Sequence, residues 1–119
     1  MGDSLYDRLG GTDGITQIAS DLVDIHMQNP LVSPRYADSD LDAVKNGAAT
    51  FFISGTGGPD VYRGKDMLET HKGMDISDEE FIAVLDDAMA ALDKNSIEQR
   101  TKEEVLFVLY SMKGDIIHG

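Results

Sequence analysis

The three histidines of this chain, His26, His71 and His118, are the first candidates for chemistry, because imidazole nitrogen both titrates near neutral pH and binds metals. His118 lies next to the end of the sequence, where we expect it to be solvated. His26 lies on the inner face of a helical segment, where a hydrogen-bonded core histidine is the commoner role. His71 follows an apolar turn, with Met67 at i−4 and Leu68 at i−3, and can place its imidazole in an apolar cavity.

Cysteine-based sites, a calcium loop, a phosphate loop and a serine nucleophile are excluded, because the sequence lacks residues that each of them requires. Cysteine is absent, which excludes disulfide frameworks, thiolate metal sites and a cysteine nucleophile. The carboxylates at 38, 40 and 42 begin like a calcium loop, but Ala43 and Ala49 stand where the glycine and the closing glutamate belong. The glycines at 55–64 resemble a phosphate loop, but Pro59 and Asp66 replace its first glycine and its hydroxyl. No Gly-x-Ser-x-Gly turn offers a serine nucleophile.

Composition narrows the partner classes further. The chain has 119 residues with 10 basic and 22 acidic side chains, a formal net charge of −12. An excess of acid on this scale argues against nucleic acid and anionic membranes as partners. With 41% hydrophobic residues, we expect one folded domain over residues 1–119. No apolar stretch approaches the roughly 20 residues that span a bilayer, and no secretory signal pattern is found, so we expect a cytoplasmic protein.

Helical periodicity indicates the elements that must position these side chains. Helices are expected from Thr12 to Asn29, after the Asp40 cap as far as Gly55, after the capping box at Ser77, and from about Glu98 onward. Their apolar stripes are Ile15, Ile18, Ala19, Leu22, Ile25 and His26; Leu41, Val44, Ala48, Phe51 and Phe52; Phe81, Val84, Leu85, Ala88 and Leu92; and Val105, Leu106, Val108, Leu109, Met112 and Ile116. Without convincing strand patterns, the sequence predicts an all-α fold with a loose loop and short helical turns before His71.

Two blocks of residues resemble the truncated hemoglobins, group I in particular. They are Leu5-Tyr6-Asp7-Arg8-Leu9-Gly10-Gly11 with Ile15, and Phe51-Phe52, Gly57-Gly58-Pro59, Tyr62, Gly64, Met67 and His71. The two blocks keep register with a group I sequence, and the resemblance continues through the last two helices. It implies a globin-like, two-over-two helical sandwich that holds heme b.

The resemblance also implies the residues of the heme site. His71 would be the proximal iron ligand, since imidazole is the usual proximal ligand of globins. Lys45 matches a position that often pairs with a heme propionate, although a solvated lysine remains an alternative. The other expected heme contacts are Tyr36, Val44, Ala48, Phe51, Phe52, Tyr62, Met67, Phe81, Val84, Ala88 and Val108.

The expected distal pocket departs from the family pattern. Val23 stands where group I members usually carry a tyrosine that donates a hydrogen bond to bound oxygen. Two positions on the distal helix that often hold glutamine or another polar residue in the family are Val44 and Ala48 in this chain. Tyr36 stands where the family usually has a phenylalanine that packs against the heme. The predicted distal set is Leu22, Val23, His26, Val44 and Ala48. Losing a donor costs about 1–3 kcal/mol, or roughly 5- to 150-fold in affinity, so we expect weak oxygen retention unless His26 or Tyr36 supplies a donor.

Three functions are compatible with this pattern. The resemblance favours reversible binding of oxygen, nitric oxide or carbon monoxide, and the family is also linked to detoxification of nitric oxide to nitrate, which needs a reductase partner. One alternative is a heme-free helical binding module. Another is a bis-histidine electron-transfer heme with His26 as the second ligand.

Overall fold

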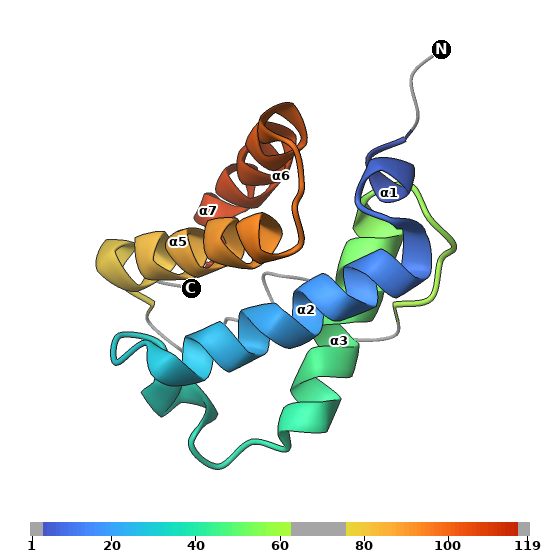
Figure 1. The fold of residues 1–119 in the computed structure, drawn as a ribbon. Helices are drawn as coiled ribbons and strands as arrows, with labels where there is room; N and C mark the ends of the chain where they lie inside the picture. The colour runs from blue at the N-terminus through green and yellow to red at the C-terminus, as the bar shows by residue number, and fades with distance from the viewer. Residues whose placement is uncertain (1–3, 63–75, 117–119) are drawn as a thin grey trace.

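The computed structural model describes residues 4–62 and 76–116, and every regular element in those ranges is a helix (Figure 1). The elements are α1 (Leu5–Arg8), α2 (Gly11–Gln28), the 3-10 turn η1 (Ser33–Tyr36), α3 (Leu41–Gly55), α5 (Asp78–Lys94), α6 (Gln99–Ser111) and α7 (Lys113–Ile116). The all-α prediction is therefore confirmed. The helical turns predicted around Met67 and His71 lie outside the described residues.

Two of the helices begin at the caps that the sequence predicts. The Asp40 carboxylate accepts hydrogen bonds from the backbone N–H groups of Asp42 and Ala43 at the start of α3. The Ser77 hydroxyl accepts from the N–H of Glu80 at 3.1 Å at the start of α5. These side chains satisfy donors that a helix terminus leaves without an intrahelical partner.

In the described parts of the chain, four long helices form two packed pairs, the two-over-two sandwich. Helix α2 lies across α3 and also packs against α5, and α5 packs against the helix that follows it, α6 (Figure 1). The short α1 contacts both α2 and α6 and closes one end of the sandwich. None of the helices in the described ranges is long and apolar enough to cross a membrane.

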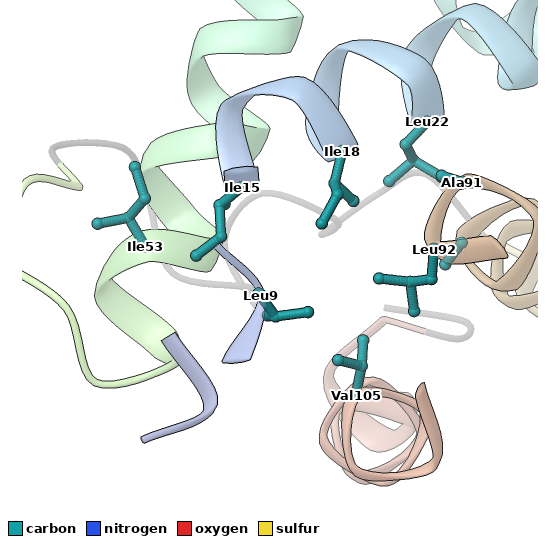
Figure 2. Close-up of a cluster of buried hydrophobic side chains, with 9 residues drawn as sticks. Leu9, Ile15, Ile18, Leu22, Ile53, Ala91, Leu92 and Val105 are labelled. Carbon is teal, nitrogen blue, oxygen red and sulfur yellow. The ribbon is translucent and has the colours of Figure 1, made fainter. Parts of the chain in front are cut away.

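One apolar core joins the two pairs (Figure 2). It contains Leu9, Ile15, Ile18, Leu22, Ile53, Ala88, Ala91, Leu92 and Val105. The stripe predicted on α2 is confirmed, since five of its six members are buried and Ile25 is half-buried. Burial of this stripe removes apolar surface from water and holds α2 between α3 and the α5–α6 pair.

The structure differs from the sequence prediction in two places. The last helix was expected to run on through Ile116, but α6 ends at Ser111, and the Met112 N–H bonds the Leu109 carbonyl at 3.1 Å. Such an i→i+3 bond tightens and ends a helix. The segment 33–36, which lies between the expected helices, forms a 3-10 turn, because Pro34 fits the first turn, where its missing N–H leaves no bond unmade.

Candidate functional site

The predicted distal residues lie on two helices that pack against each other, α2 and α3. Val23 is 2% exposed and Leu22 is also buried, both on the inner side of α2. Val44 and Ala48 are half-buried on α3, which packs against α2. These four side chains carry no hydrogen-bonding group, so none of them can donate a hydrogen bond.

His26, the fifth predicted distal residue, belongs to a buried polar cluster between α2 and α5. It is 4% exposed, and its Nδ1 lies 2.7 Å from Oδ2 of Asp87. The Asn29 amide donates to both oxygens of the same carboxylate, at 3.1 and 3.2 Å. The Tyr36 ring lies parallel to the His26 ring, with centroids 6.0 Å apart. The cluster fixes the imidazole and commits one of its nitrogens to Asp87.

Tyr36 is the predicted heme contact that brings a hydroxyl to this region. Burial raises the pKa of its phenol, and the opposing effect of the Arg35 charge is smaller, so Tyr36 remains a neutral O–H donor. Arg35 in turn binds Glu80 at the start of α5 through two hydrogen bonds, of 2.7 and 2.9 Å. These bonds hold the pKa of Glu80 below its ordinary value. The pair ties η1 to α5 and thereby positions Tyr36.

An aromatic cluster occupies the far end of α3. The Phe51 ring packs edge-on against both Phe52 and Tyr62, with centroid distances of 5.8 and 5.3 Å. The Ser54 hydroxyl oxygen accepts hydrogen bonds from the N–H groups of Val61 and Tyr62, both at 3.0 Å. These bonds anchor the chain to α3 immediately before residues 63–75, the segment that contains His71 and Met67 and lies outside the described residues.

Four of the predicted heme contacts on α5 and α6 differ in their surroundings. Phe81 is buried and packs edge-on against Tyr110, at 6.1 Å between ring centroids, while Val84 is half-buried. Ala88 and Val108 line an apolar cavity of about 30 Å³. Its other lining residues are Leu5, Leu9, Ile15, Ile18, Leu22, Phe52, Thr56, Leu92, Val105 and Leu109. A cavity of this size and lining has room for about one water but offers it almost no polar partners.

Lys45, expected at a heme propionate, makes an ion pair with another protein side chain. Its amine lies 2.9 Å from Oδ1 of Asp24 on α2. Both side chains are partly exposed, so the pair adds little stability. The propionate role of Lys45 stays a prediction.

The arrangement fits a porphyrin on two grounds. First, Val44, Ala48, Phe51 and Phe52 form an apolar stripe on α3 that is only half-buried, whereas Ala49 and Ile53 on the same helix are buried in the core. A flat apolar disc would remove the rest of that stripe from water. Second, the bond from Nδ1 of His26 to Asp87 fixes that imidazole between α2 and α5, whereas His71, the predicted axial ligand, lies outside the described residues.

The sequence reasoning missed the partners of the buried polar groups. Asp87 was not singled out, nor was Asp21, whose carboxylate accepts hydrogen bonds from Asn95 at 2.8 Å and Gln17 at 3.1 Å. Burial alone would raise the pKa of Asp21, but these bonds and the Lys94 charge outweigh it and lower the pKa. The position of each aspartate in its helix could have indicated burial. Asp21 lies three residues after Ile18 and Asp87 three residues after Val84, so each aspartate falls on the apolar side of its own helix.

Comparisons with known proteins agree with this geometry. The family model described as "Bacterial-like globin" matches residues 4–118. The group 1 truncated hemoglobin GlbN of Nostoc sp. (strain MUN 8820) is 26% identical over 97% of this chain and 98% of its own length.

Solved structures share the fold. The Fe(III) form of truncated hemoglobin from Tetrahymena pyriformis superposes with a TM-score of 0.94 at 23% identity, over 98% of this chain and 100% of that chain. A 2/2 hemoglobin from Synechococcus sp. PCC 7002, in the cyanomet state with covalently attached heme, has a TM-score of 0.89 at 20% identity, over 97% and 98% of the two chains. The chain therefore belongs to the bacterial-like globin family, among the truncated, two-over-two hemoglobins.

Proposed function

We propose that this protein binds heme b with His71 as the proximal ligand, and reversibly binds a diatomic gas on the opposite side of the iron. Membership of the truncated hemoglobin family supports heme-based gas binding in general. The heme supplies the metal that takes the gas. The protein supplies the axial imidazole, an apolar enclosure and control of the hydrogen bonds available to the gas.

The observation that carries the proposal is the half-buried apolar stripe of α3, next to the aromatic cluster of Phe51, Phe52 and Tyr62. Apolar side chains are more stable when they are fully removed from water, so a half-buried stripe of this size favours an apolar ligand lying against it. The Ser54 bonds hold Tyr62 against α3, and His71 follows nine residues later in the sequence.

We propose that the distal side retains oxygen weakly. Val23, Leu22, Val44 and Ala48 offer no donor to a bound gas, and Nδ1 of His26 is engaged by Asp87. Bound oxygen carries partial negative charge and loses about 1–3 kcal/mol of stabilisation without a donor. Carbon monoxide and nitric oxide depend less on such a donor. Oxygen should therefore dissociate fast, which favours sensing or short-term binding over long storage.

Detoxification of nitric oxide to nitrate is the second candidate activity, because the family is linked to it. It requires a supply of electrons from a reductase to return the iron to its ferrous state. Weak oxygen retention works against this role, since oxygen must stay bound until nitric oxide arrives.

The direct test is to titrate the purified chain with hemin and record absorbance in the ferric, ferrous and ferrous carbon monoxide states. We expect one heme per chain, a five-coordinate ferrous spectrum and a sharp Soret shift with carbon monoxide. Failure to take up stoichiometric heme would overturn the proposal in favour of a heme-free binding module. A six-coordinate ferrous spectrum without added ligand would favour the bis-histidine heme with His26.

A further inference from the structure

The outer face of the α5–α6 pair has an unusual concentration of exposed apolar side chains. Among the described residues, the large hydrophobic side chains with the most exposure include Phe107 at 74%, Tyr110 at 50% and Ile82 at 47%. All three lie on this one face. Contiguous exposed apolar surface in a folded protein commonly marks an interaction site.

This face combines a ridge with a groove. Phe107 and Glu103 border a groove of about 540 Å³ between α5 and α6, whose other lining residues are Ile82, Leu85, Asp86, Met89, Leu106 and Tyr110. The same two side chains border a second hollow of about 540 Å³, between α1 and α6, which contains Arg8 and Arg100. Phe107 therefore stands on a ridge with a hollow on each side. A surface with a protruding ring beside a hollow can be complementary to itself, as a two-fold interface requires.

The charges of the face also suit a second copy of the chain. The molecule as a whole carries a net charge of −12, so two copies repel each other over most approaches. Helix α6 is balanced, with the basic residues Arg100 and Lys102 beside the acidic Glu103 and Glu104. Ion pairs of Lys102 with Asp93 and of Lys113 with Asp78 neutralise carboxylates near both ends of α5.

The two hollows differ in charge. The α1–α6 hollow holds Arg8 and Arg100 beside Glu103 and Glu104, whereas the groove between α5 and α6 holds only acidic charges, Asp86 and Glu103. A two-fold axis parallel to α6 would bring Phe107 of each copy into the α5–α6 groove of the other. The same rotation would turn the Arg100 side of one copy toward the Asp86 side of the second.

We propose that this protein forms a homodimer through the α5–α6 face, with Phe107 as the central contact of each copy. The apolar side chains Ile82, Met89 and Tyr110 line the groove that receives the ring. Arg100 and Asp86 fix the register, because charge pairs at the rim of an interface mainly determine specificity. The opposite side of α6 faces the core, where Val105 is buried and Leu109 packs against the apolar cluster.

The first test is sedimentation velocity of the full chain, purified with hemin, over a concentration series. We expect a species of twice the 13.0 kDa chain mass that grows with concentration. Phe107→Glu should weaken the dimer at least tenfold, because a central aromatic contact of an interface is a typical hot spot. Val61→Glu is the matched control, since Val61 is 39% exposed, borders a hollow lined by residues of α2 and α3, and should leave association unchanged.

The second test is a charge exchange. Arg100→Glu and Asp86→Arg should each weaken association, and the two substitutions together should restore it, because the pair is then re-formed across the interface. Circular dichroism melting checks that all variants fold. The proposal is overturned if the wild-type chain stays monomeric at every concentration, which would leave the face to a different protein. It is also overturned if Phe107→Glu associates like the wild type.

Discussion

Along α2, the first half of the helix and its C-terminal end are buried in very different surroundings. Ile15 and Ile18 face an apolar core that contains a small cavity. One turn further than Leu22, His26 is equally buried but is bonded to Asp87 on α5. The first region gains stability from packing alone, whereas the second needs each polar group to keep its partner. The difference shows that a single helix can do two things. The first half of α2 packs in the apolar core, and its C-terminal end joins α2 to α5 through hydrogen bonds between buried polar side chains.

Removing the carboxylate from the polar cluster should have the largest effect on stability. Asp87→Ala leaves the buried His26 imidazole and the Asn29 amide without their partner, and we expect a loss of about 4 kcal/mol in the free energy of unfolding. Urea unfolding followed by circular dichroism measures this loss. Asp38→Ala is the matched control, because Asp38 is an exposed aspartate outside both the cluster and the α5–α6 face and should change stability by less than about 0.5 kcal/mol. Equal effects of the two substitutions would contradict the role of the cluster.

Truncation in the apolar half should cost somewhat less. Ile15→Ala enlarges a cavity that already exists beside the side chain, and we expect a loss of about 3 kcal/mol. The same urea experiment applies, with Leu31→Ala as a control at an exposed apolar position. A loss below about 1 kcal/mol would contradict the claim that the first half of α2 gains its stability from tight apolar packing.

A donor placed in the apolar distal wall should slow the release of oxygen. For Val23→Tyr, the dissociation rate of oxygen should fall roughly 5- to 150-fold relative to Val23→Phe, which adds the same bulk without the hydroxyl. Stopped-flow replacement of oxygen by carbon monoxide measures both rates. Equal rates would contradict the apolar distal pocket, and so would faster oxygen release in Tyr36→Phe, because Tyr36 would then already be the donor.

The smallest effect concerns acid stability. Hydrogen bonds from Asn95 and Gln17 lower the pKa of Asp21 in the folded protein against the effect of burial. The stability that Asp21 contributes is therefore complete above its ordinary pKa of 3.8 and is lost as pH falls through the lower folded value. In Asp21→Asn, the free energy of unfolding should fall less steeply over this acid range than in the wild type. A parallel pH profile for the two proteins would show that other carboxylates account for the dependence.

Local signals predicted much of this fold. The caps at Asp40 and Ser77 and the stripe on α2 depend on residues within a few positions of one another, so their chemistry is visible in the sequence. The contact between His26 and Asp87 joins residues 61 positions apart, and no local pattern encodes it. The ion pair between Lys45 and Asp24 is of the same kind, since it depends on the angle at which α2 crosses α3.

The candidate site was predicted mainly by family resemblance. Val44, Ala48, Phe51 and Phe52 lie on one helix with helical spacing, so their common stripe followed from periodicity as well. The cavity shared by Leu22, Phe52, Ala88 and Val108 depends on packing between four helices and could not be read from any one of them.

The central claim concerns one bond, from the imidazole of His71 to iron, and resonance Raman spectroscopy of the ferrous protein tests it most directly. The heme-loaded wild type should show an iron–histidine stretching band. The band should be absent from His71→Ala and return when free imidazole is added, while His118→Ala should keep it unchanged. An undiminished band in His71→Ala would contradict the account, because a different side chain would then hold the iron.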